Sequence, residues 1–211
     1  MIRIFFILIT VFFFINPLFA DEIPMDRLNN FAKQMLERSN QAVGYPVNQN
    51  IDLKEFYQWY LDSGLHGVAM NNVGNPRKHS PYSMNTHEFE NEVIGFFTPL
   101  YGFEPHNTWG IVTFSGTDGN NHGIYFGGFL PFTGHKEIVD RKKIYFDSIA
   151  VSGHKFFGFD DPMGIFITTR EVLDNQNPFK VPYLLDAVPT ITCSRSALGA
   201  LKFWWKVQRT G

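Results

Sequence analysis

The spacing of apolar residues predicts an amphipathic helix near the start of the chain, over residues 25–42. Leu28, Phe31, Met35 and Leu36 fall on one side of this helix, and charged residues fall on the other. A helix with one apolar side packs that side against something else. The pattern therefore predicts a helical arm ahead of the main body of the protein.

Three more helices follow from the same spacing. The first covers 53–61, and the side chain of Asp52 is placed to cap it. The second begins at Thr86 and is stopped by Pro99, while the third covers 197–207. The segment between the first two, 64–83, is rich in Gly, Asn, Pro and Ser and predicts a long loop.

Short apolar runs predict three strands, over 109–114, 147–151 and 163–169. The first strand leads into a glycine-rich turn at 115–121, and a helix is predicted to start within 122–126. A strand, a glycine-rich turn and a helix N-terminus together bind phosphate through free backbone N–H groups and the helix dipole. This stretch is therefore a candidate phosphate site.

The second strand ends in Ser152-Gly153-His154-Lys155, which presents one lysine after small residues. A lysine held at the end of a buried strand can be kept partly desolvated, which lowers its pKa and makes it nucleophilic toward carbonyl groups. A Schiff base with pyridoxal phosphate is the best-known use of such an amine. Lys155 is therefore the candidate catalytic residue.

The composition narrows the class of protein. The chain has 211 residues, of which 44% are hydrophobic, enough for one domain or for a fragment of a larger one. The formal net charge is −2 without basic runs, which argues against a nucleic-acid surface. A single cysteine, Cys193, excludes an internal disulfide and a cysteine-based zinc site, and the scattered histidines give no metal-binding spacing.

The first twenty residues differ from the rest. Arg3 is followed by an apolar, Phe-rich run over 4–15, and Ala20 precedes an acidic pair. This layout predicts a signal peptide cleaved after Ala20, and an uncleaved membrane anchor or an apolar N-terminal helix are the alternatives. A signal peptide would make the protein secreted or periplasmic, and only an uncleaved anchor would hold it at a membrane.

Two of these elements, 115–120 and 152–155, together resemble the phosphate loop and the cofactor lysine of the group II pyridoxal-phosphate-dependent amino-acid decarboxylases. The closest branch is the bacterial histidine decarboxylases with the related plant serine decarboxylases. Shorter stretches carry the resemblance over most of residues 40–205, namely Gly44-Tyr45-Pro46, Asn71-Asn72-Val73-Gly74-Asn75-Pro76, Glu88-Phe89-Glu90-Asn91-Glu92-Val93, Trp109-Gly110-Ile111-Val112-Thr113 and Met163-Gly164-Ile165.

The resemblance implies an α/β fold of the aspartate-aminotransferase-like type (PLP fold type I), with pyridoxal 5'-phosphate as cofactor and a homodimer as the working form. It implies that the strands carrying the phosphate loop, the lysine and residues 163–169 are neighbours in one sheet. Family members are expected in the cytoplasm. The cofactor-binding residues that it implies are Gly116, Thr117, Asn120, Ser152, His154 and Lys155, with Lys155 joined covalently to the cofactor. Asp118 stands where the family usually has Glu, which keeps the charge.

One departure from the family is a gap in the middle. About thirty residues separate Asn120 from Lys155, where the family has a long segment that includes a histidine stacked on the pyridine ring and an aspartate paired with the ring nitrogen. Asp147 lies eight positions before Lys155, about 26 Å away along a continuous strand, and so cannot replace that aspartate. Asp160 and Asp161 are the remaining acidic candidates.

His122 and His135 are the nearest candidates for the stacking histidine, and both are interpreted as surface or structural residues. The small C-terminal domain of the family is also expected to be absent. We therefore predict a signal peptide or anchor at 1–20, an N-terminal helical arm and loop at 21–85, and an incomplete large domain at 86–211.

Two functions remain open at this point. The first is a pyridoxal-phosphate-dependent amino-acid decarboxylase, with histidine as the expected substrate. The second is a truncated, catalytically inactive relative that acts at most as a binding or interaction protein.

Overall fold

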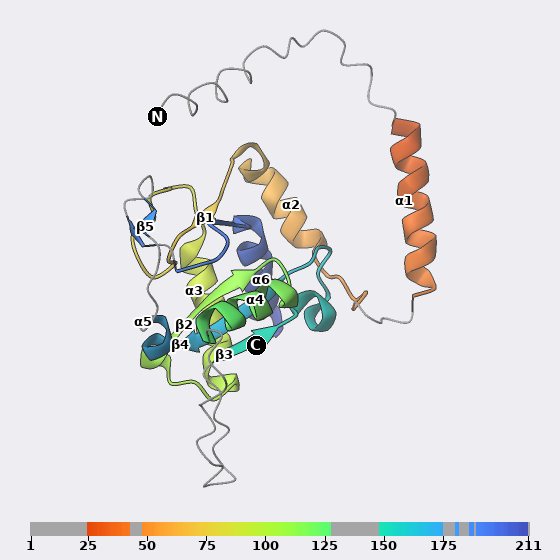
Figure 1. The fold of residues 1–211 in the computed structure, drawn as a ribbon. Coiled ribbons are helices and arrows are strands. Elements are labelled where there is room, and N and C mark those ends of the chain that lie inside the picture. Colours follow the sequence, from red (N-terminus) through yellow and green to blue (C-terminus); the bar gives the residue numbers. More distant parts are fainter. Residues whose placement is uncertain are drawn as a thin grey trace, which may run out of the picture. The chain divides into compact units, whose positions relative to one another are not determined.

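The computed structural model describes residues 25–42, 48–127, 148–174, 180–181, 186–187 and 189–210 (Figure 1). The helices and strands, in chain order, are α1 (Met25–Asn40), α2 (Lys54–Asp62), η2 (Leu65–Gly67), β1 (Asn72–Val73), α3 (His87–Leu100), η3 (Pro105–Asn107), β2 (Thr108–Thr113), α4 (Gly116–Gly127), β3 (Ser148–Val151), η4 (His154–Gly158), β4 (Gly164–Thr169), α5 (Arg170–Asp174), β5 (Lys180–Val181), β6 (Asp186–Ala187), β7 (Ser194–Arg195) and α6 (Ala197–Thr210).

The central sheet of the described chain has three strands in the order β2-β4-β3. β4 runs antiparallel to both neighbours, so β2 and β3 run parallel to each other on either side of it. Two short antiparallel pairs, β1 with β7 and β5 with β6, complete the strand pairing. The prediction that these three strands are neighbours is confirmed.

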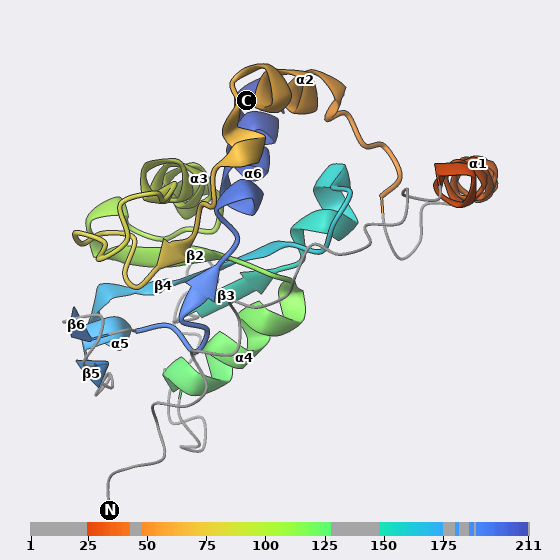
Figure 2. The same cartoon turned by 90° about the horizontal axis from the view of Figure 1, so that it is seen from above.

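Helices cover both faces of this sheet (Figure 2). α3 and α6 lie on one face, and α4 and α5 lie on the other. Alternate residues of a strand point to opposite faces, so Val112 and Ile165 pack with α3 and α6 while Ile111 and Phe166 face the other way. Because helices cover both faces of the sheet, all six residues of β2 are buried, including the threonines at its two ends. The α/β fold class is confirmed.

Two helix starts differ from the sequence prediction. α2 follows Leu53, and no side chain caps its first turn; Asp52 instead pairs with Arg209 at 3.4 Å. α4 begins at Gly116 rather than within 122–126, because Ser115 caps it earlier. The glycine-rich stretch is therefore the first turn of a helix rather than a loop that precedes one.

The chain divides into two compact units, residues 1–43 and 44–211. α1 is the described part of the first unit, and it confirms the helix predicted over 25–42. The second unit includes residues 44–85, which the sequence grouped with the N-terminal arm. The predicted signal peptide or anchor at 1–20 lies outside the described residues. Among the helices that are described, none has the length and apolar character needed to span a bilayer.

Candidate cofactor-binding site

The first element of the candidate site is the turn Phe114–Thr117 at the start of α4, here called the phosphate turn. The Asp118 N–H donates to Ser115 Oγ at 3.1 Å, and the Phe114 N–H donates to Asp118 Oδ2 at 3.1 Å. This reciprocal arrangement is close to a capping box and fixes the helix start. It leaves the N–H groups of Gly116 and Thr117 without a hydrogen-bond partner among the described residues. Two backbone donors and the helix dipole are therefore available to an anion.

The second element is the turn Ser152–Gly158, here called the lysine turn. It follows β3 and contains one turn of π-helix, η4. The Lys155 N–H donates to the Ser152 carbonyl at 3.3 Å, which folds the chain back at this point. The turn therefore places Lys155 just beyond the end of its strand.

Two glycines bring the two turns together. A Cβ added to Gly116 would lie 2.9 Å from the Cβ of Ser152, and one added to Gly119 would lie 2.9 Å from the Cβ of Ala150. Only glycine leaves room for α4 to approach β3 and the lysine turn this closely. The phosphate turn and the lysine turn are therefore in direct contact, at one end of the sheet.

The side chain of Lys155 is exposed. A lysine at a buried strand end can be partly desolvated, but Lys155 is not. The reason is local, because the π-helical turn carries Lys155 to the surface after β3 ends. Its amine is open to an aldehyde ligand.

His154 is fastened to the start of β4. Its ring Nδ1 lies 3.0 Å from the Met163 carbonyl oxygen and 3.4 Å from Ser152 Oγ. The backbone N–H of His154 donates to the same Met163 carbonyl at 3.2 Å. These contacts fix the orientation of the imidazole. None of these contacts involves Nε2 of the ring.

The remaining predicted residues lie on α4. Thr117 and Asn120 are exposed in its first turns, next to the two free N–H groups. Burial raises the pKa of Asp118, but hydrogen bonds from His122 and from the Phe114 N–H, with the charge of Arg195, outweigh it and lower the pKa overall. A charged carboxylate is thereby held in the first turn, where the helix dipole favours it.

His122 lies on α4, one turn after Asp118, and is fully buried. Its Nδ1 lies 2.8 Å from the Asp118 carbonyl oxygen, and its Nε2 accepts a hydrogen bond from the Ile191 N–H at 3.3 Å. Both ring nitrogens are engaged, so His122 is a structural residue and no candidate for stacking on a cofactor. His135, the other candidate, lies outside the described residues.

Asp160 and Asp161 are not available to a cofactor ring. Lys202 on α6 donates to Asp160 Oδ1 at 2.8 Å and to Asp161 Oδ1 at 2.6 Å. The Tyr57 hydroxyl donates to the second oxygen of Asp160. These carboxylates therefore hold a buried cation, and the suggestion that one of them pairs with the ring nitrogen is wrong. Asp147 lies outside the described residues.

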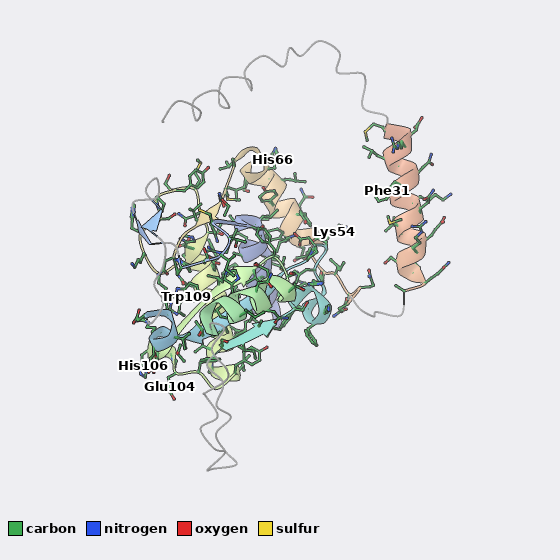
Figure 3. All side chains as sticks on the ribbon, in the orientation of Figure 1. Phe31, Lys54, His66, Glu104, His106 and Trp109 are labelled. Atoms are coloured by element: carbon green, nitrogen blue, oxygen red, sulfur yellow. The ribbon has the colours of Figure 1, made fainter. Side chains whose placement is uncertain are left out.

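The described histidines do not gather into a metal site. Figure 3 shows His66 and His106 at opposite ends of the compact body, and the described residues contain no cluster of histidine, cysteine and acidic side chains that could hold a metal. A pocket of about 130 Å³ adjoins the phosphate turn at Phe114, on the side of α6, where Ser196 and Asp161 line it; Lys155 does not.

The described residues fit two parts of pyridoxal phosphate. The free N–H groups at the start of α4 suit the phosphate, and the exposed amine of Lys155 in the adjoining turn suits the aldehyde. The partners of the pyridine ring are a different matter, because the candidates within the described residues are all engaged elsewhere. Among the described residues, the arrangement therefore suits the phosphate and the aldehyde of the cofactor, and the acidic and histidine candidates for its ring are bonded elsewhere.

Comparisons with known proteins bear on the fold and on the family to which the chain is similar. No family model matches the chain. Serine decarboxylase 1 of Oryza sativa subsp. japonica is 32% identical over 97 residues, which is 46% of this chain and 19% of the relative. The histidine decarboxylase of Mesorhizobium japonicum is 31% identical over 99 residues, and that of Vibrio campbellii is 28% identical over 126 residues.

Among solved structures, the L-methionine decarboxylase from Streptomyces sp. 590, crystallised with L-methionine methyl ester, matches with a TM-score of 0.67. The match covers 89% of this chain and 75% of that chain at 13% identity, so it bears on the fold alone. The chain spans only 19% to 31% of the length of the curated relatives named above.

The three-stranded sheet with helices on both faces, together with the match to L-methionine decarboxylase, indicates part of a large α/β domain of PLP fold type I. Within that class, the chain is a relative of the group II pyridoxal-phosphate-dependent amino-acid decarboxylases.

Proposed function

We propose that this chain binds pyridoxal phosphate across the phosphate turn and the lysine turn, and that it takes part in the decarboxylation of an amino acid. The observation that carries the proposal is the contact between Gly116 and Ser152, which sets the start of α4 against the turn that contains Lys155. Histidine is the substrate to test first, because histidine decarboxylases are among the relatives. A homodimer is the expected assembly.

Each residue of the site has a distinct role in this proposal. The N–H groups of Gly116 and Thr117 hold the phosphate at the positive end of α4. Lys155 provides the amine for the aldehyde, while Ser152 and His154 border the phosphate from the lysine turn. When bound, the cofactor supplies an electron sink for the carbanion that is left when CO₂ departs.

A second function is favoured by one specific observation. Asp160 and Asp161 are committed to Lys202, and both nitrogens of His122 are engaged, so no described candidate supports the pyridine ring. A site with anchors for the cofactor but without an ion pair to the ring nitrogen binds the cofactor with little catalysis. Cofactor binding and decarboxylation must therefore be tested separately.

Cofactor binding can be tested on the purified full chain by titration with pyridoxal phosphate, followed by borohydride reduction and peptide mapping. We expect a visible absorbance band and a reduced adduct on Lys155. Lys155→Ala should lose both, whereas Lys54→Ala, which removes another exposed lysine, should keep them. Wild-type protein without a band, or with label spread over several lysines, would reject the proposal.

Activity can be tested by release of labelled CO₂ from carboxyl-labelled histidine, serine and methionine. Release that depends on Lys155 would establish the decarboxylase and rank its substrates. An adduct on Lys155 without release from any of the three would favour the binding function.

A further inference from the structure

A buried ion pair lies behind the phosphate turn, outside the residues of the proposed site. Arg195 on β7 and Glu90 on α3 are 3% and 0% exposed. Arg195 donates from Nε to Glu90 Oε1 at 3.2 Å and from a terminal nitrogen to Oε2 at 3.1 Å, while its other terminal nitrogen donates to the Gly74 carbonyl at 3.0 Å. The two charges are thus matched in a two-pronged geometry, and both side chains are buried.

Glu90 also accepts two hydrogen bonds from other elements. The Val112 N–H of β2 donates to Oε1 at 2.9 Å, and Asn72 Nδ2 donates to Oε2 at 3.0 Å. Each carboxylate oxygen therefore has two donors. This carboxylate joins the body of α3 to strand β2 on one side and to β1 and β7 on the other.

The bond to Val112 connects the ion pair to the site. Val112 lies on β2, and the strand ends at Thr113, directly before the phosphate turn. Thr113 Oγ1 donates to the Ser115 carbonyl at 2.8 Å, which ties the end of β2 to the residue that caps α4. A movement of β2 at Val112 would therefore move Ser115, and with it the free N–H groups of Gly116 and Thr117.

The charge of Arg195 also acts on the first turn of α4. Burial raises the pKa of Asp118, and the charge of Arg195 is among the contributions that outweigh it. The guanidinium therefore acts on the phosphate turn mainly through Glu90, which bonds β2, and its charge also favours the ionised carboxylate of Asp118.

Resting on the proposed function, we infer that Glu90 and Arg195 are positioning residues for the cofactor phosphate. They hold the end of β2 so that the N–H groups of Gly116 and Thr117 face one point. The alternative is that the pair only stabilises the fold. The two roles separate in the contribution of the phosphate itself, which is the ratio of the dissociation constants of pyridoxal and pyridoxal phosphate.

The experiment measures both dissociation constants for wild type and for three variants that are shown to be folded. Arg195→Lys keeps the charge but cannot make the two-pronged contact. The double variant Glu90→Leu with Arg195→Met removes both charges, which a protein interior usually tolerates better than one unpaired charge. Lys202→Met is the matched control, because it removes a buried cation of the same body whose hydrogen bonds go to Tyr57, Asp160 and Asp161 and not to Glu90.

We expect the Arg195→Lys and double variants to bind pyridoxal phosphate about tenfold more weakly, the effect of losing one or two charged hydrogen bonds, with pyridoxal binding almost unchanged. The ratio should stay at its wild-type value in Lys202→Met. If both constants shift together in the Arg195 variants, or if the ratio is unchanged in both, the positioning role is overturned.

The two levels of the proposal fail in different ways. A wild-type chain that binds the two aldehydes equally well would overturn the proposed phosphate site, and the positioning role with it. A wild-type preference for pyridoxal phosphate that survives in both Arg195 variants would overturn the positioning role alone.

Discussion

Two buried cations are linked to segments that adjoin the two turns: Arg195 reaches β2 through Glu90, and Lys202 bonds Asp160 and Asp161, which follow the lysine turn. The surroundings of the two cations differ. Arg195, behind the phosphate turn, is paired with a carboxylate that is itself fully buried. Lys202, behind the lysine turn, is buried, yet the side chains of its partners Asp160 and Asp161 are 34% and 47% exposed. The Arg195 pair is therefore shielded from solvent, a dry pair, whereas the carboxylates bonded to Lys202 are open to solvent.

This difference matches the roles that we propose for the two turns. Donors for a phosphate must stay fixed, and a dry, fully paired ion pair is rigid because any movement leaves a buried charge unmatched. A lysine that bonds an aldehyde has to be reachable, and Lys155 is exposed on a turn whose support is partly hydrated. Charged pairs in the two places should therefore differ in energy and in pH dependence.

The largest expected effect is the loss of the dry pair. Arg195→Ala leaves Glu90 buried without its cation, and such uncompensated charges cost about 3–5 kcal/mol. The free energy of unfolding, measured by urea titration, should fall by this amount. The double variant Glu90→Leu with Arg195→Met should recover most of the loss, and a double variant as unstable as the single one would show that the cost is packing and not charge.

Removal of Lys202 should cost less. Lys202→Met takes three hydrogen bonds from Asp160, Asp161 and Tyr57, but water can hydrate the two carboxylates that remain. We expect a loss of about 1.5–3 kcal/mol in the same urea titration. A loss as large as that of Arg195→Ala would mean that the two supports are equally dry and would remove the contrast between them.

The pH dependence of the Lys202 support has two limits. Burial lowers the pKa of Lys202, but hydrogen bonds to Asp160 and Asp161 outweigh it and raise the pKa above 10.5. Burial raises the pKa of Asp160, but hydrogen bonds from Lys202 and Tyr57 bring it below 3.8. Burial and the bond to Asp160 raise the pKa of Tyr57 above 10.0.

The signs follow from these directions. The Asp160 contribution is present above pH 3.8 and is lost as the pH falls through the lowered pKa of the folded state. The Lys202 contribution is present below pH 10.5 and is lost as the pH rises through the raised pKa. The stability difference between wild type and Lys202→Met should therefore be flat from pH 5 to pH 9 and shrink outside that range. A difference that varies across neutral pH would contradict this assignment of charges.

The contact between the two turns can be tested with a pair of glycines on α4. Gly116→Ala places a Cβ 2.9 Å from Ser152 Cβ, whereas Gly123→Ala meets its nearest neighbour at 3.8 Å, an ordinary contact. Overpacking should cost Gly116→Ala about 1–3 kcal/mol. Gly123→Ala should gain up to about 1 kcal/mol from helix propensity. Equal effects of the two substitutions on thermal unfolding would show that the turns are not in tight contact.

Much of the scaffold could be predicted from local sequence. Apolar runs mark β2, β3 and β4, because strands buried on both faces must be continuously apolar. The start of α4 was missed because glycines lower helix propensity, although Ser115-x-x-Asp118 was a readable capping signal. Of the site residues, the resemblance identified both turns, while the exposure of Lys155 depends on a π-helical turn that no local pattern marks.

The two ion clusters could not be found in this way. Glu90 and Arg195 are 105 positions apart, and Lys202 is 42 positions from Asp160. Nothing in the local sequence distinguishes Glu90 or Lys202 from a surface charge, since charged residues in helices usually face solvent. Only the packing of β1, β7 and α6 on the sheet brings these partners together.

The smallest effect is expected at the outer surface, where Arg209 of α6 pairs with Asp52 at 3.4 Å and with Glu55 at 2.8 Å. These three side chains are 40%, 60% and 70% exposed, so water and salt screen the pairs. Arg209→Ala should therefore change the free energy of unfolding by about 0–1 kcal/mol.

The comparison of Arg195, Lys202 and Arg209 then becomes a series in which the contribution of each cation to the free energy of unfolding follows the burial of its partners. High salt should abolish the Arg209 effect and leave the Arg195 effect almost unchanged, because only the first pair is open to solvent ions. An Arg209→Ala loss that persists in high salt would mean that its guanidinium group, whose central carbon lies 5.9 Å from the centre of the Trp205 ring, contributes through its contact with that ring instead of through the ion pairs.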